Sequence, residues 1–474
     1  MTRVFRVPHG GDGADRGWTG SVRPAPHGVP AAPARTPSPR VTPRPAVPVP
    51  APPAATATPA GPTAAEVACS PCAREATTHP RACRPHSVTG TGSFAERDRR
   101  WTALHRAMAE ESYDALVFAG ADYRGHKGSL RYLADYNLAH RYGYAVMFAD
   151  EAPVMVLPQN LVSGRRPATA WVDDYEYPYN LGEGLAKLLA DRRQVARIGI
   201  VGMGQVMKVE DYLQLRAALP GRELVDASLL FERVRATKSP AELEAVKEGA
   251  YILDRCFDRL LEIARPGMTE RALAAEMYGV AALLGGEDPL FLTMYVDPEP
   301  TGAVPTFGVP RDRELRPTDL LCFSYELVGP SGYWVEFARM VTFAPPREPV
   351  ERMARAVSGG IAAATGALRP GAAMGDVQRA LLAAIEAEGT KTSYWSGHGM
   401  GLDVLEEPWV GLDVVQDGGD AGAITAAADG MVLAIHPTPW DEPHQTMGYM
   451  ADSLVISEGV CRSLSQHPVQ LYRV

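Results

Sequence analysis

The sequence predicts an α/β protein in which a small mixed α/β domain precedes a larger domain of helices packed on an antiparallel sheet. Three observations lead to this fold class. The chain has 474 residues, of which 46% are hydrophobic, so it is long enough for two or three domains with sizeable cores. Strand-like and helix-like periodicities alternate over residues 94–235, as in α/β domains. From residue 236 to residue 474 the order is helices, strands, helices and strands, which indicates two related halves.

Residues 1–93 differ in composition from the rest of the chain. They are rich in Pro, Ala and Arg, contain few aromatic residues and show no periodicity. Such a segment cannot bury enough apolar surface to offset its conformational entropy, so we expect it to be disordered.

The first domain, residues 94–235, is expected to begin with an amphipathic helix over 96–111, because Trp101, Leu104 and Met108 recur at helical spacing. The elements expected after it are a strand at 113–119, a helical turn at 131–136, a hairpin of strands 144–149 and 152–157, a helix at 181–191, a strand at 197–201 and a helix at 208–218.

A helix start signal marks the boundary with the second domain, residues 236–474. Ser239 is a favourable N-cap, Pro240 occupies the first helical position and Glu242 stands three residues after the cap. The elements expected from there are helices from 240 to about 264 and after Thr269, strands at 290–296, 320–328 and 333–343, helices at 350–364 and 374–388, and strands at 430–436 and 449–456.

Charge and cysteine usage restrict the class of function. The formal net charge of −9 argues against nucleic acid or an anionic membrane surface as a partner. No apolar run reaches the roughly 18 residues of a membrane span, and the N-terminus lacks the apolar core of a signal peptide. Cys256, Cys322 and Cys461 lie far apart, which is typical of reduced core thiols. We therefore expect a cytoplasmic protein that acts on a small molecule.

The stretch 394–408 carries the clearest chemical signal. Gly397, Gly399 and Gly401 surround His398, and glycine allows the backbone to approach another group closely. The alternation of apolar and polar residues suits a strand or a strand followed by a turn. A histidine held there can carry a proton, contact an anion or a carbonyl group, or bind a metal.

Four motifs of the second domain resemble those of the creatinase, prolidase and methionine aminopeptidase family. They are Lys238–Glu244 with Arg265–Glu270, the hairpin Asp319–Phe343, the loop Gly397–Asp403 with Glu406 and Pro408, and the strand Gly430–Pro437. Residues 94–235 resemble the N-terminal domain of the two-domain members. The resemblance implies the pita-bread fold, a curved antiparallel sheet with flanking helices and pseudo-twofold symmetry, and it implies a homodimer.

The peptidases of this family bind two metal ions through two Asp, one His and two Glu residues, and here the chain departs from the pattern. The corresponding positions hold Tyr325, Glu336, His398, His436 and Ala451. A register shift of one residue would offer Glu326 in place of Tyr325, but no such shift supplies a ligand at 451. Two adjacent divalent ions need several negative ligands to offset their repulsion. We therefore predict that the dinuclear site is lost.

The resemblance to creatinase, which hydrolyses a C–N bond of a small guanidino acid without metal, implies a metal-independent hydrolase or lyase without a cofactor. Its substrate would be a small amino-acid-like molecule cleaved at a C–N or related bond, in a setting such as specialised metabolism. In this interpretation His398 or His436 is the general acid or base, and Glu336 binds a cationic or amide N–H group.

Three further residues are candidates for substrate binding. Tyr325 or Tyr333 can donate to a developing oxyanion. Arg339 either clamps a substrate carboxylate or forms a structural salt bridge, since its planar fork suits both.

Three alternatives remain open. In the first, Glu336, His398 and His436 hold one divalent transition metal, because two histidines and one carboxylate suit a borderline cation. The second is a non-catalytic binding or scaffold protein that kept the fold. The third is a residual Xaa-Pro metallopeptidase.

Overall fold

The structure, a computed structural model, describes residues 91–139, 141–158, 171–297, 308–412 and 424–474. Residues 1–93 are expected to be disordered, and residues 1–90 of that segment lie outside the described ranges. The helices are α2 (Phe94–Glu111), α3 (Gly128–Ala134), α4 (Leu181–Ala190), α5 (Val209–Ala218), α6 (Ser228–Arg235), α7 (Pro240–Ile263), α8 (Glu270–Leu283), α9 (Glu348–Ala367) and α10 (Met374–Ala387).

The strands of the first domain are β1 (Ala115–Ala121), β2 (Tyr142–Phe148), β3 (Val154–Val156), β4 (Asp174–Glu176), β5 (Arg197–Val201) and β6 (Glu223–Asp226). Those of the second are β7 (Glu287–Asp297), β8 (Leu320–Val328), β9 (Trp334–Phe337), β10 (Met340–Thr342), β11 (Trp395–Gly399), β12 (Glu406–Gly411), β13 (Val432–Ile435), β14 (Trp440–Asp441), β15 (Thr446–Met447), β16 (Asp452–Ser457), β17 (Val460–Ser463) and β18 (Leu471–Arg473).

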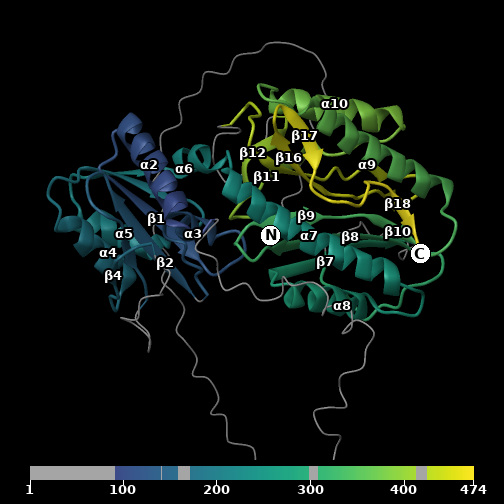
Figure 1. Ribbon diagram of the computed structural model, residues 1–474, viewed down its shortest axis with the longest axis horizontal. Helices are drawn as coiled ribbons and strands as arrows, with labels where there is room; N and C mark the ends of the chain where they lie inside the picture. The colour runs from purple at the N-terminus through teal and green to yellow at the C-terminus, as the bar shows by residue number, and fades with distance from the viewer. Residues whose placement is uncertain (1–90, 140, 159–170, 298–307, 413–423) are drawn as a thin grey trace, which may run out of the picture. The chain divides into compact units, whose positions relative to one another are not determined.

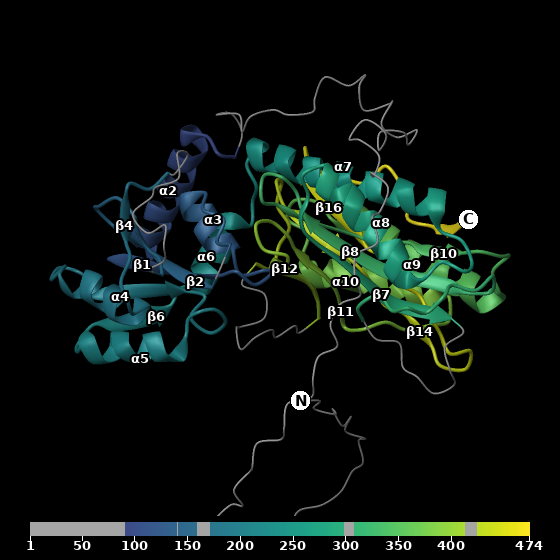
Figure 2. The same cartoon turned by 90° about the horizontal axis from the view of Figure 1, so that it is seen from below.

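The first domain is a mixed six-stranded sheet with helices on both faces. The strand order is β4-β3-β2-β1-β5-β6, with β1 antiparallel to β2 and parallel to β5. Leu104, Leu130 and Phe231 bring α2, α3 and α6 into one apolar cluster, whereas Leu185 and Leu215 bring α4 and α5 into another (Figure 2). The expected alternation of strands and helices is confirmed. The expected elements did not include β4, β6 and α6, which are short and partly exposed.

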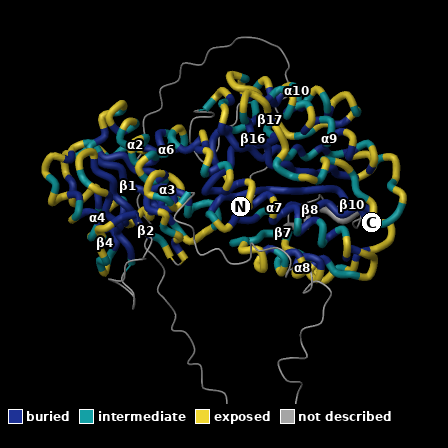
Figure 3. The backbone as a smooth tube through the Cα atoms, viewed as in Figure 1, coloured by how far each residue is buried: buried dark blue, intermediate teal, exposed yellow. Residues whose placement is uncertain are grey.

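The second domain has two halves, each with a five-stranded sheet and a pair of helices. One sheet joins β18, β10, β8, β7 and β9, and the other has the order β12-β11-β13-β16-β17. A bridge between Ala338 and Ala451 connects them. The pairs α7–α8 and α9–α10 lie outside the strands, which are mostly buried (Figures 1 and 3). This arrangement confirms the two related halves, and the strand expected at 333–343 is divided into β9 and β10.

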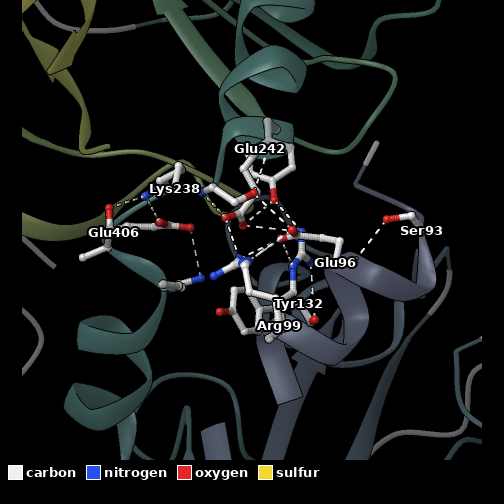
Figure 4. Close-up of polar contacts among 12 residues, drawn as sticks. Ser93, Glu96, Arg99, Tyr132, Lys238, Glu242 and Glu406 are labelled. Atoms are coloured by element: carbon white, nitrogen blue, oxygen red, sulfur yellow. Dashed lines mark hydrogen bonds and ion pairs between the residues drawn. The ribbon is translucent and has the colours of Figure 1, made fainter. Parts of the chain in front are cut away.

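The predicted start of α7 is confirmed and also links the two domains. The Ser239 side chain accepts from the Glu242 N–H, and the Glu242 carboxylate accepts from the Ser239 N–H. The same carboxylate is held at 2.8 Å by Arg99 of α2, and the Ser239 hydroxyl donates to Glu96 at 3.1 Å (Figure 4). The capping box is thus part of a buried ionic cluster.

Among the described helices, none combines the length and apolar character needed to cross a membrane.

Candidate functional site

The structure brings together Glu336, His398 and His436. Glu336 lies in β9, His398 lies in β11, and His436 directly follows β13. Because His398 pairs with Ala434 across antiparallel strands, His436, two residues further on, points to the same side of the sheet. β9 is fixed beside β16, since the Glu336 N–H donates to the Ser453 hydroxyl and that hydroxyl donates to the Glu336 carbonyl.

Two glycines allow the strand that carries His398 to fit between its neighbours. A Cβ at Gly397 would lie 2.4 Å from the Ala434 carbonyl oxygen, and one at Gly399 would lie 2.2 Å from the Glu407 carbonyl oxygen. No side chain can be accepted at such distances without moving the backbone. The expected strand-turn conformation of this stretch is confirmed, since β11 and β12 form an antiparallel pair.

The spacing of the three side chains differs from that of a hydrogen-bonded dyad. Their donor atoms all lie within 4.8 Å of one another, and the His398 Nε2 is 3.7 Å from the Glu336 Oε2. That distance is too long for a hydrogen bond. It is close to the separation of two ligands on one cation, because bonds of about 2.1 Å at a tetrahedral angle set their donor atoms about 3.4 Å apart.

Neighbouring groups orient two of these side chains. The His398 Nδ1 lies 2.9 Å from the Gly399 carbonyl oxygen, which can only accept, so the neutral ring carries its proton on Nδ1 and directs the Nε2 lone pair towards Glu336. The Tyr449 hydroxyl donates to the Glu336 Oε1 at 2.9 Å. Such supporting contacts fix the orientation of metal ligands and of catalytic bases alike.

Burial dominates the electrostatics of the site. It lowers the pKa of His398 to about 4, with a smaller contribution from the neighbouring His436 and an opposing one from Glu336. Burial likewise lowers the pKa of His436 to about 4. It raises the pKa of Glu336, against the effects of His398 and the Tyr449 hydroxyl. Both imidazoles are therefore neutral near pH 7 and offer a lone pair to a proton or a cation.

The lowered pKa of His398 predicts a pH-dependent stability. The ordinary pKa of histidine is 6.5, and that of His398 in the folded protein is about 4. Between these pH values His398 is protonated in the unfolded chain but not in the folded chain, so the free energy of unfolding falls as the pH falls. Because this side chain is only 2% exposed, its contribution lowers the free energy of unfolding by about 2 kcal/mol from pH 7 to pH 5. In urea unfolding of chelator-treated protein, we expect the free energy of unfolding of His398→Gln to fall by about 2 kcal/mol less than that of the wild type over the same pH range.

The matched control is His444→Gln, which removes an exposed histidine at the surface. It is expected to keep the wild-type difference between pH 7 and pH 5. Since the raised pKa of Glu336 acts in the opposite direction, the comparison between variants is the test. Equal acid sensitivity of His398→Gln and the wild type would contradict the assignment.

The hairpin of β8 and β9 places Glu326, and not Tyr325, on the side of Glu336. Glu326 pairs directly with Glu336, and Tyr325 pairs with Phe337. Adjacent residues of a strand point to opposite faces, so the mapping of Tyr325 onto this site is corrected by one residue. The Tyr325 hydroxyl instead donates to the Met277 carbonyl oxygen at 3.2 Å. Burial and the repulsion of Glu336 raise the pKa of Glu326 to about 8.

A cavity of about 650 Å³ lies beside these three side chains. Glu326, Trp334 and Trp409 line it from the second domain, and Arg124 and His126 line it from the first. Glu336, His398 and His436 are not among its lining residues. Two of its lining residues are neighbours of the site: Glu326 lies opposite Glu336, and the ring centroid of Trp409 lies 5.7 Å from that of His398. The sequence interpretation missed Arg124 and His126, because only the fold brings these residues of the first domain to the cavity.

The remaining two candidates for substrate binding, Tyr333 and Arg339, have buried protein partners. The Tyr333 hydroxyl donates to Glu242 at 2.7 Å and accepts from Arg100 at 2.8 Å. Arg339 forms an ion pair with Asp452 at 2.9 Å and is fully buried. The structure therefore places Tyr333 in the interdomain cluster and not at the site. For Arg339 it shows the salt bridge, which is one of the two roles that the sequence left open.

Comparison with known proteins identifies both domains. Residues 244–460 match the model of metallopeptidase family M24, and residues 100–237 match that of the creatinase/prolidase N-terminal domain. A probable dipeptidase PepE of Mycobacterium tuberculosis is 28% identical over 338 residues, 69% of this chain and 84% of the relative. The ectoine hydrolase of Halomonas elongata is 26% identical over 298 residues, 58% of this chain and 70% of the relative.

Solved structures show the same fold. The dipeptidase PepE of Mycobacterium ulcerans superposes with a TM-score of 0.65 at 23% identity, covering 80% of this chain and 98% of the other. The prolidase of Pyrococcus horikoshii gives a TM-score of 0.64 at 18% identity, covering 77% and 98%. These likenesses show the fold, and the two family models, which together cover most of the chain, show that the chain belongs to metallopeptidase family M24, in its creatinase and prolidase group.

Proposed function

We propose that this protein is a hydrolase that cleaves a C–N bond of a small amino-acid-like substrate at Glu336, His398 and His436. The observation that carries the proposal is the convergence of these three side chains, with donor atoms within 4.8 Å of one another, beside a cavity of about 650 Å³. A cavity of that size suits a small ligand.

The residues do not fit the pair of cations that the family's peptidases hold. Ala451 has no donor side chain, and its carbonyl accepts from the Ala338 N–H and from Arg339. His436 supplies a neutral nitrogen where the family has a carboxylate. Among the described residues at these positions, the carboxylates are Glu326 and Glu336, and Glu336 raises the pKa of Glu326. Two divalent ions at short distance would lack the negative charge that holds them together.

The same residues fit one divalent transition cation. Two neutral imidazoles and one carboxylate suit such an ion, and the 3.7 Å separation of His398 Nε2 and Glu336 Oε2 suits ligands of a common centre better than a direct contact. When bound, the ion would polarise an amide or acyl oxygen of the substrate. The geometry thus favours the single-metal alternative over the metal-independent enzyme expected from the resemblance to creatinase.

The chain's own residues supply the remaining functions. Glu326 faces both the cavity and Glu336, so it is placed to hold a proton for a departing nitrogen. Trp334 and Trp409 provide flat apolar walls that exclude water from one side of the ligand. The names of two relatives, a probable dipeptidase and an ectoine hydrolase, make dipeptides and ectoine the first substrates to test. The homodimer stays a prediction.

The decisive experiment measures metal and turnover on the same preparations. We expect protein reloaded separately with zinc, manganese, iron(II) and cobalt to retain about one equivalent of at least one cation after gel filtration. Reloaded protein should release amine from a dipeptide or from ectoine, and chelation should abolish that release.

Two variants serve as controls. Glu336→Ala should lose the retained cation, whereas Glu351→Ala, at an exposed position of α9, should keep it. Turnover by metal-free protein at the undiminished rate would restore the metal-independent alternative. Two retained equivalents with rapid Xaa-Pro dipeptide cleavage would establish a dinuclear peptidase instead.

A further inference from the structure

A tight turn of the first domain enters the cavity of the second. The turn lies between β1 and α3, and it is closed by the hydrogen bond from the His126 N–H to the Tyr123 carbonyl. Two contacts with the second domain anchor it, since the Gly128 N–H donates to Asp403 at 2.8 Å and Lys127 pairs with Asp288 at 2.6 Å. The turn is therefore held in place before any ligand binds.

Arg124 at the tip of this turn differs from the other arginine that lines the cavity. Arg235 pairs with Glu232 and Asp403, and it lies 3.2 Å from Glu406, so its charge is neutralised. Among the residues that the structure describes, Arg124 hydrogen-bonds only the Pro289 carbonyl, at 3.2 Å, and pairs with no carboxylate. Arg124 thus offers most of a planar guanidinium fork to the cavity.

Glu326 is a neighbour of both Arg124 and Glu336. It lies within electrostatic reach of Arg124 and directly opposite Glu336. No ion pair within 4.0 Å joins Arg124 to Glu326 in the described parts of the chain, so the space between them is available to a ligand. A substrate carboxylate is the group that a free guanidinium fork binds best, because it accepts two parallel hydrogen bonds.

We propose that Arg124 binds the carboxylate of an amino-acid-like ligand and thereby orients the ligand's other end towards Glu336, His398 and His436. This inference rests on the proposed function and deepens it, because it makes the substrate class anionic at one end. It also assigns the first domain a specificity-determining residue. Arg124 replaces Arg339 as the carboxylate clamp that the sequence suggested.

The test measures binding alone, so that it is independent of turnover. N-acetyl derivatives of alanine, proline, leucine and phenylalanine, and the corresponding C-terminal amides, are titrated into the full-length protein by isothermal calorimetry. Each acid and its amide differ only in the carboxylate. We expect at least one acid to bind about ten- to a hundredfold more tightly than its amide, as one charge-assisted bidentate contact supplies.

Three variants test whether Arg124 causes the tighter binding of the acid than of its amide. Arg124→Gln should abolish it, Arg124→Lys should keep part of it, and Arg271→Gln, in an exposed ion pair with Asp312, should leave it unchanged. Equal affinity for acids and amides in the wild type, or an acid preference that survives Arg124→Gln, would overturn the proposal. If no hydrolysis is found but the preference depends on Arg124, the proposed function fails and the carboxylate site stands.

Discussion

His398→Ala is expected to lower kcat by about a thousandfold on whichever dipeptide, or ectoine, the wild type hydrolyses. A general acid or base contributes about a hundred- to ten-thousandfold, and His398 also belongs to the cluster of three side chains that could hold a cation among the described residues. Its Nε2 lies 3.7 Å from Glu336, and its ring centroid lies 5.7 Å from that of Trp409 and 5.1 Å from that of His436.

Steady-state kinetics and the metal content of the variant together distinguish a metal ligand from a proton-transfer group. Loss of turnover with loss of the retained cation indicates a ligand, and loss of turnover with full metal content indicates proton transfer. Circular dichroism checks the fold, and His398→Gln provides a second variant that fills more of the space. The control is His444→Ala, at an exposed histidine that pairs with Asp441. Retention of more than about a tenth of the turnover by His398→Ala would remove His398 from the catalytic machinery.

Much of the fold could be predicted because its signals are local. The Ser239 cap, with Pro240 and Glu242, is a signal four residues long, and it forms the capping box that the sequence indicates. Likewise Gly397 and Gly399 mark a strand whose neighbours approach closely. In contrast, β6 (Glu223–Asp226) has four partly or fully exposed residues and no clear periodicity, so its presence depends on pairing with β5.

The site could be predicted only in part, because register and distant partners decide the rest. A shift of one residue in β8 exchanges Tyr325 for Glu326 at the cavity, and nothing in the local sequence fixes that register. Tyr333 is bound by Arg100, which lies 233 residues earlier in the chain. Arg124 lies on a turn of the first domain, and a hydrogen bond from Gly128 to Asp403 holds that turn against the second domain. Residue type suggested the chemistry of these side chains, but not their surroundings.

Arg339→Met is expected to destabilise the protein by about 3–5 kcal/mol, because it leaves the buried Asp452 carboxylate without its partner. The guanidinium also donates to the carbonyls of Ala338, Ala451 and Pro468, and its carbon lies 4.1 Å from the Phe337 ring centroid. Burial raises the pKa of Asp452 and Arg339 opposes that rise, so the variant should also be most unstable at high pH. Urea unfolding with an unchanged m-value measures the loss.

Two further variants separate a structural arginine from a substrate ligand. Arg379→Met breaks an exposed pair with Asp376 on α10 and should cost less than about 1 kcal/mol. The double variant Arg339→Met with Asp452→Leu should recover part of the lost stability, because it removes the unpaired charge while the backbone carbonyls remain unsatisfied. A substrate-binding arginine would give the opposite pattern: little change in unfolding and a large rise in KM. A stable Arg339→Met protein with weakened substrate binding would therefore return the carboxylate clamp to Arg339 and contradict its structural assignment.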